Sequence, residues 1–248
     1  MIWRLALASL VVLAAAEKRS GYQDASPETR AMQDDDASNP GFLWVKQGEA
    51  LWSQPTGSAG RSCADCHGAA PTSMRGVAAR YPVVDAQLGR PITLEQRIEQ
   101  CRVERQGTAP AESDSDALLG LTAYVGLQSR GIPMQVSVDG PARPFYEAGR
   151  ALFATRQGQF NLSCAQCHDD RAGERLGGNV IPQGHPNGYP EYRLEWQSMG
   201  SLDRRIRDCM VGVRAEPLTA DALDLAELEL FLGARANGLK VETPAVRP

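Results

Sequence analysis

The sequence is poor in aromatic residues, which make up 6% of it, and it has three histidines among its 248 residues. No stretch is apolar for the roughly 20 residues that a membrane-spanning helix needs. A basic excess is also lacking, because 26 Lys and Arg stand against 30 Asp and Glu. This mild acidity argues against general nucleic-acid binding. The length suits one large domain or two ordinary ones of about a hundred residues.

Four of the six cysteines lie in a motif that occurs twice. The copies are Cys63-Ala-Asp-Cys66-His67 and Cys164-Ala-Gln-Cys167-His168. The pattern C-x-x-C-H is typical of c-type haem attachment, in which two thiols bond the porphyrin and the histidine binds its iron. A redox dithiol or half a zinc site also contains C-x-x-C, but no close second pair of zinc ligands follows. The sequence therefore predicts two covalently bound haem c groups, which supply much of the apolar core.

A longer unit repeats around each motif. Ahead of it, Gly48-x-x-Leu51-Trp52 and Gly149-x-x-Leu152-Phe153 lie 101 residues apart, as do the two motifs themselves. Behind it come Leu94-x-x-Arg97-Ile98-x-x-Cys101 and Leu202-x-x-Arg205-Ile206-x-x-Cys209. This duplication predicts a mainly α fold of two tandem class I cytochrome c-like domains.

The chain divides at changes of composition. Residues 1–16 read as a secretory signal, with Arg4, an apolar run and Ala14-Ala15-Ala16 as a cleavage site. Export to the periplasm agrees with c-type haem, which bacteria attach outside the cytoplasm. The polar segment that follows predicts a loosely structured arm. The predicted parts are an arm at 17–40, domain 1 at 41–131, a linker at 132–143, domain 2 at 144–240 and a tail at 241–248.

Helices are expected at matching places in both domains. The first should run from about Gly41 to Trp52, and its second copy has Pro144 in its first turn. Thr93, with Gln96 three places on, predicts the N-cap of a short helix to about Arg102. Terminal helices are expected over 116–129 and from about 221. Gly126 and Gly233 are expected to let these helices cross the first helices closely.

The second axial ligand of each haem is the next question. Candidates are His185, the methionines Met74, Met134 and Met210, and the two remaining cysteines. Methionine is usual in electron-transfer cytochromes, but Met210 has Arg102 as its counterpart. Only the cysteine recurs in both units, so Cys101 and Cys209 are predicted as thiolate ligands. A Cys101–Cys209 disulfide is the alternative.

Thiolate ligation favours ferric iron and a low potential, and a metal-bound sulfur is a nucleophile. Arg205 lies one helical turn before Cys209, so both share a helix face. Arg214 follows Cys209 closely in the chain. A guanidinium fork suits sulfate-like oxyanions, so the second site is predicted to bind an anionic sulfur substrate.

These residues resemble the SoxA family of dihaem cytochromes. Each C-x-x-C-H has a later R-x-x-x-C, and the second continues as Cys209-Met-x-x-x-Arg214-Ala-Glu-Pro. The resemblance implies L-cysteine S-thiosulfotransferase activity, in which thiosulfate is joined to a cysteine of the carrier SoxYZ with release of two electrons. It implies a heterodimer with the monohaem cytochrome SoxX.

The resemblance also implies roles for individual residues. The second haem is the active one, with His168 and Cys209 as its ligands and Cys209 becoming a persulfide. Arg205 is the substrate-contacting arginine. His67 and Cys101 then bind the first iron, which some relatives lack.

Other functions fit the motifs. A dihaem electron carrier would have a methionine ligand, Met210, and a high potential. A thiosulfate dehydrogenase would release tetrathionate and need no protein carrier. A cytochrome c peroxidase is disfavoured, because the exchangeable ligand and calcium site that it expects are not visible in the sequence.

Overall fold

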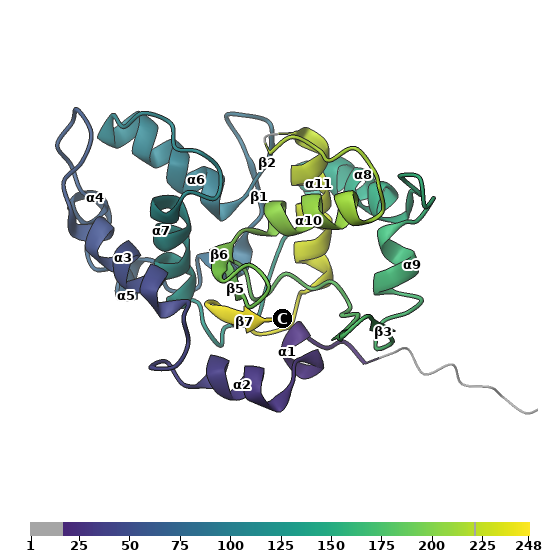
Figure 1. Ribbon diagram of the computed structural model, residues 1–248. Coiled ribbons are helices and arrows are strands. Elements are labelled where there is room, and N and C mark those ends of the chain that lie inside the picture. Colours follow the sequence, from purple (N-terminus) through teal and green to yellow (C-terminus); the bar gives the residue numbers. More distant parts are fainter. Residues whose placement is uncertain (1–16, 221) are drawn as a thin grey trace, which may run out of the picture.

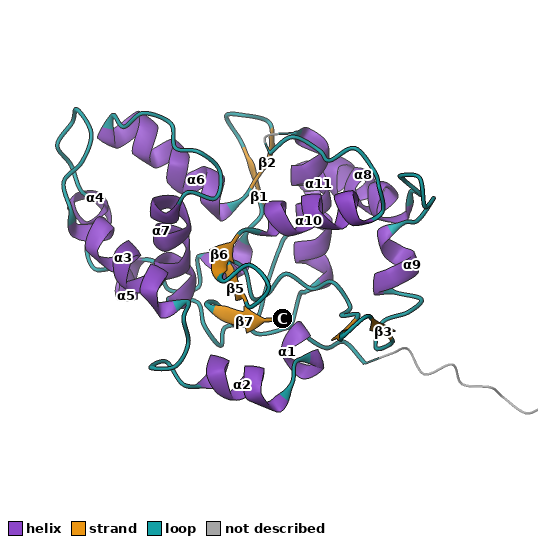
Figure 2. Ribbon diagram, in the orientation of Figure 1, coloured by secondary structure: helices purple, strands orange, loops and turns teal. Residues whose placement is uncertain are grey.

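The computed structural model describes residues 17–220 and 222–248, so the predicted signal peptide at 1–16 lies outside the described residues. Two helical halves flank small strands in the middle of the molecule (Figure 1). The fold is mainly α, as predicted (Figure 2). Among residues 17–220 and 222–248, no helix combines the length and apolarity needed to cross a bilayer.

The four main helices and one hairpin follow the same order in both halves, and each half adds short elements of its own. The first half contains α3 (Phe42–Ser53), α4 (Cys63–His67), α5 (Ala70–Ser73), η1 (Ala78–Arg80), β1 (Val83–Asp85), β2 (Arg90–Ile92), α6 (Leu94–Cys101), the π-helical turn η2 (Arg102–Gln106) and α7 (Asp116–Leu127). The second contains η3 (Gly140–Ala142), α8 (Arg143–Ala154), α9 (Cys164–His168), β3 (Arg175–Leu176), β4 (Asn179–Val180), β5 (Glu191–Arg193), β6 (Ser198–Gly200), α10 (Leu202–Gly212) and α11 (Leu223–Arg235).

The first and last helices of each half cross closely. A Cβ atom at Gly48 of α3 would lie 2.0 Å from the Gly120 carbonyl oxygen of α7. A Cβ atom at Gly149 of α8 would lie 2.0 Å from the Glu227 carbonyl oxygen of α11. Glycine at these positions lets the two backbones touch.

The prediction that Gly126 and Gly233 make these crossings is wrong. A Cβ atom at Gly126 would meet Thr243, and one at Gly233 would meet Pro82 and Val136. Both glycines therefore lie on the faces of α7 and α11 that pack between the halves. The glycines that make the crossings belong to the first helices and to the early part of α7.

The arm at 17–40 is ordered, which contradicts the loose structure expected for it. It forms α1 (Gly21–Asp24) and α2 (Pro27–Asp34), with Ser20 and Ser26 as N-caps. Its Gln33 side chain accepts a hydrogen bond from the Val246 backbone at 3.0 Å. The segment expected as a tail contains β7 (Ala245–Arg247), whose residues are all buried. The arm is ordered because it packs on β7, a contact between distant parts of the chain.

Two hairpins share one register. In β1–β2, Asp85 lies opposite Arg90, and in β5–β6, Arg193 lies opposite Ser198. Each second-half residue follows its counterpart by 108 positions. Strand β7 adds to β5 in parallel, pairing Arg193 with Arg247. The second hairpin thereby becomes part of a three-stranded sheet, whereas the first remains two-stranded.

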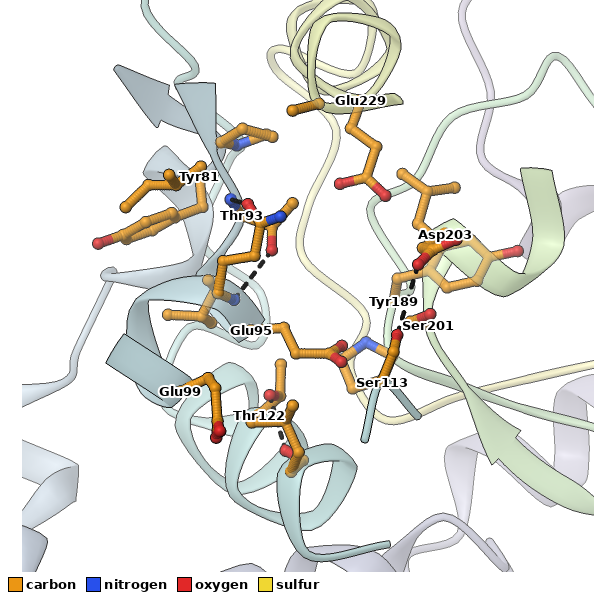
Figure 3. Close-up of a pocket in the computed structure, with 18 of the residues that line it drawn as sticks. Tyr81, Thr93, Glu95, Glu99, Ser113, Thr122, Tyr189, Ser201, Asp203 and Glu229 are labelled. Carbon is orange, nitrogen blue, oxygen red and sulfur yellow. Dashed lines mark hydrogen bonds between the residues drawn. The ribbon is translucent and has the colours of Figure 1, made fainter. Parts of the chain in front are cut away.

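A cavity of about 420 Å³ lies between the halves (Figure 3). Equivalent residues of both halves line it, namely Tyr81 and Tyr189, Thr93 and Ser201, and Glu95 and Asp203. Glu229 points into it and is 5% exposed. Burial, and then the charge of Asp203, raises the pKa of Glu229 well above its ordinary value. Burial, and then the charge of Asp114, raises the pKa of Glu95 to about 8.

These carboxyls make the cavity sensitive to pH. The Glu95 carboxyl ionises near pH 4.5 in the unfolded chain and near 8 in the folded one, so its contribution disfavours the folded state increasingly between these values. Replacing Glu95 by Gln should therefore raise the free energy of unfolding at pH 8 by roughly 2–4 kcal/mol, with little change at pH 4. Urea titrations of the haem-loaded protein measure this. Glu147→Gln, which loses surface ion pairs with Arg143 and Arg150 away from the cavity, is the control and should give no such gain.

Candidate functional site

Each predicted haem-attachment motif forms a five-residue helix with the same N-terminal cap. The Ser62 hydroxyl accepts a hydrogen bond from the Asp65 backbone, and the Asp65 side chain accepts one from the Ser62 backbone. Ser163 and Gln166 repeat this capping box on α9. The caps satisfy orphan N–H groups and hold both cysteines and the histidine on one helical turn.

The histidine of the second motif is oriented for metal binding. Its Nδ1 lies 2.7 Å from the Pro182 carbonyl oxygen, which accepts a hydrogen bond from Nδ1–H and leaves Nε2 with a free lone pair. Burial lowers the pKa of His168, which favours the neutral ring that binds iron. His67 of the first motif packs instead against Trp52, with ring centroids 5.8 Å apart.

Both halves tie the loop before the motif to the turn after the distal cysteine. In the first, Ala59 N–H donates to the Gln106 carbonyl at 3.0 Å. In the second, Gln159 N–H donates to the Arg214 carbonyl at 3.2 Å. A Cβ atom at Gly57 or Gly158 would lie 2.1 Å from the facing carbonyl oxygen. Two thiols, an imidazole and a facing thiol within such a closed loop fit a covalent haem c.

Each distal cysteine lies beside its own motif. Burial raises the pKa of Cys101, and the nearby Cys66 sulfur adds to this effect. Burial also raises the pKa of Cys209, with Cys167 among the groups close enough to act on it. No disulfide links any of the six cysteines, so the Cys101–Cys209 disulfide, the alternative from the sequence, is not present.

The other candidate ligands make contacts of their own. Met210 is buried in an apolar cluster with Phe153 and Leu228. Met134 belongs to the cluster between the halves, and Met74 packs against the core of the first. His185 Nδ1 lies 2.8 Å from the Arg19 carbonyl of the N-terminal arm.

Arg205 and Cys209 come together as predicted, on α10. The Arg205 charge opposes the effect of burial on the pKa of Cys209, and Arg193 acts in the same direction. Arg205 Nη1 lies 3.4 Å from Glu195 Oε1. Arg193 Nη2 lies 2.9 Å from the same oxygen. The second site therefore holds two guanidinium groups beside its distal sulfur.

Arg193 was missed by the sequence reasoning, and the first half shows why it matters. Its counterpart there, 108 residues earlier, is Asp85, which forms an ion pair with Arg97. Asp85, which neutralises Arg97 at the first site, is thus replaced at the second site by Arg193. The offset changes from 101 to 108 between His168 and Tyr189, and aligning both Tyr-Pro pairs would have exposed the exchange.

Arg214, the other predicted anion-binding residue, lies in the turn after α10 and is exposed. Its backbone has a left-handed φ of 57°. The guanidinium lies over the Phe160 ring at 4.8 Å and donates to Gln159 Oε1 at 3.4 Å. Its role in substrate binding stays a prediction.

Comparisons with known proteins agree with these features. The family model described as SoxA/TsdA, cytochrome c domain, matches residues 47–134 and 148–241. The L-cysteine S-thiosulfotransferase subunit SoxA of Pseudaminobacter salicylatoxidans is 42% identical over 93% of this chain and 81% of its own. The corresponding subunit of Paracoccus pantotrophus is 38% identical over 92% and 78%. A crystal structure of SoxXA from P. pantotrophus superimposes with a TM-score of 0.89 at 37% identity, covering 92% of this chain and 86% of that one.

Proposed function

Because this chain belongs to the SoxA family of c-type cytochromes, we propose that it is the catalytic subunit of an L-cysteine S-thiosulfotransferase. The observation that carries the assignment to the second half is the exchange of Asp85 for Arg193. Arg97 is neutralised by a buried acid, whereas Arg205 pairs at 3.4 Å with Glu195, whose side chain is 43% exposed. The Arg205 guanidinium, whose charge acts on the Cys209 sulfur, is therefore more open to an anionic substrate than Arg97 is.

The reaction joins thiosulfate to a cysteine of a SoxYZ-like carrier protein. The carrier thiol loses its proton, an S–S bond forms between its sulfur and the sulfane sulfur of thiosulfate, and two electrons are released. Covalently bound haem c would supply one-electron acceptors, so the haem near Cys209 needs a second acceptor, the haem of the SoxX-like partner. In this chain, Cys63 and Cys66 would attach one haem, and Cys164 and Cys167 the other.

The residues of the chain divide the remaining work. His67 with Cys101, and His168 with Cys209, would bind the two haem irons. Arg205 holds the thiosulfate oxygens by charge-assisted hydrogen bonds, and Arg214 adds a second cation at the rim. The Cys209 sulfur first bonds to the sulfane sulfur, and the two electrons are lost in this step; the deprotonated carrier cysteine then attacks the sulfane sulfur and displaces the Cys209 thiolate.

The partners and the location follow from the family. The chain pairs with a monohaem SoxX-like cytochrome to form a heterodimer, and it meets the carrier in the periplasm after removal of residues 1–16. The haem-binding units extend over 41–131 and 144–240.

Replacing Arg205 by Gln should lower kcat/KM for thiosulfate by about 10²-fold, because a charged contact to the substrate is lost. Arg205→Lys should recover part of this, since the charge remains and the fork does not. Arg97→Gln, at the equivalent position of the first half, is the control. It breaks the ion pair between Arg97 and Asp85 but leaves the second site intact, so kcat/KM for thiosulfate should change much less. Coupling assays with the carrier, at equal haem content, measure all three. Free tetrathionate as the main product would contradict the proposed reaction.

A further inference from the structure

The Glu195 carboxylate is shared between the two arginines of the second site. One oxygen, Oε1, accepts from Arg193 Nε at 3.1 Å and from Arg193 Nη2 at 2.9 Å. The same oxygen lies 3.4 Å from Arg205 Nη1. Glu195 is therefore held by two hydrogen bonds on the Arg193 side and by one long contact on the Arg205 side.

The two ends of this bridge differ in mobility. Arg193 is buried and also pairs with Glu191 at 3.3 Å, so its place is fixed. The side chains of Glu195 and Arg205 are 43% and 34% exposed. The contact between them faces solvent, where an ion pair is weak and exchanges readily.

The first half lacks such an exchangeable contact. Asp85, the partner of Arg97, is 5% exposed and accepts hydrogen bonds from the Gln87 and Leu88 backbones, each at 2.8 Å. Its carboxylate is fixed by its own strand and turn. Arg97 therefore keeps its counter-ion permanently, and the equivalent arginine of the second half does not.

We propose that Glu195 is an exchangeable counter-ion that controls anion binding at Arg205. Without substrate, Glu195 occupies the guanidinium of Arg205. Thiosulfate, a dianion, displaces it, and Arg193 retains the released carboxylate. After coupling, the carrier-bound thiosulfonate has one negative charge less, so Glu195 regains Arg205 and favours release.

This inference rests on the proposed function for the identity of the anion, but its geometry concerns any small sulfur oxyanion. Removing the competitor should tighten binding. Glu195→Gln is expected to lower the Kd for thiosulfate and for sulfate by roughly two- to fivefold, because an exposed carboxylate–guanidinium pair contributes up to about that much. Glu195→Asp should stay near the wild type, since the charge remains.

Arg193→Gln should act in the opposite direction. Without Arg193, nothing draws Glu195 away from Arg205, so anions should bind several-fold more weakly. Opposite changes in two variants of one ion-pair network cannot both follow from general destabilisation. Asp85→Asn is the matched control in the first half, because it frees Arg97 and leaves the Arg205 site intact.

The experiment is calorimetric titration of the haem-loaded protein with thiosulfate and with sulfate, in the absence of the carrier. Circular dichroism and the haem absorption spectrum verify that each variant is folded. Steady-state assays with the carrier then test whether KM, more than kcat, follows the Kd.

Equal or weaker anion binding by Glu195→Gln overturns the proposal, as does a gain of the same size in Asp85→Asn. Should Glu195→Gln fail to fold, Glu195→Ser on the same exposed turn replaces it. The outcome is separate from the proposed reaction, because anion binding can tighten in a protein that does not couple thiosulfate. If Glu195→Gln couples thiosulfate with an unchanged KM, the proposed reaction is supported and the proposed exchange of Glu195 is contradicted.

Discussion

Replacing Cys209 by alanine should abolish thiosulfate coupling, with a loss of at least about 10³-fold in kcat, because the variant has no sulfur to receive the sulfane atom. The alanine side chain is smaller than cysteine and uncharged, so it introduces no clash that could account for the loss of activity. Arg205 and Arg193 remain in place to bind the anion. The Kd for thiosulfate should therefore change much less than kcat.

Low-temperature EPR of the oxidised protein gives an independent measurement. Wild type should show two low-spin signals of thiolate-ligated haem, and Cys209→Ala should lose one of them. Cys101→Ala, the matched variant of the first half, should lose the other signal and far less of the coupling. A methionine-type signal that survives Cys209→Ala would remove Cys209 from the iron and leave an electron-carrier function.

Replacing Gly149 by alanine should prevent stable assembly of the second half. The added Cβ atom would lie 2.0 Å from the Glu227 carbonyl oxygen and 3.0 Å from the Phe231 Cβ atom. Neither atom belongs to a flexible side-chain end, so α8 and α11 must separate. The expected cost is about 3 kcal/mol or more, with loss of the haem carried by α9.

A helical glycine without neighbours provides the control. Gly212 ends α10, and a Cβ atom there would have nothing within 4 Å. Gly212→Ala should leave the free energy of unfolding unchanged or raise it by up to about 1 kcal/mol. Haem content and chemical unfolding, measured for both variants, decide the matter. Equal stability of Gly149→Ala and wild type would show that the helices can move apart at no cost.

Local patterns predicted the helices well. The cap at Thr93 and the early proline of α8 lie where the sequence places them. The crossings were misplaced, because a helix pattern says which residues share a face and not which residue touches another backbone. Only the packing of α7 shows that Gly48 touches another helix backbone and that Gly126 instead faces Thr243.

The predicted ligand pairs and Arg205 came from a repeat readable over short distances. Arg193 did not, because the repeat changes its offset inside a variable segment. Arg193 lies on β5 and Cys209 on α10, so the effect of Arg193 on the pKa of Cys209 depends on how these two elements pack. The order of the arm arises from contacts across more than 200 residues, and the strand character of residues 245–247 arises from pairing with β5, 54 residues earlier. Local propensity reports neither.

Strand β7 imposes an order on assembly. It closes the edge of β5, and β5 carries Arg193 and precedes Glu195 by two residues. Residues 245–247 follow both C-x-x-C-H helices in the chain, so all four cysteines of these helices are synthesised before this edge can be closed. Pairing over such sequence separation is slow compared with forming a helix. The cysteines are thus in place while the strand that carries Arg193 is still open, and the surroundings of Arg193 are completed last.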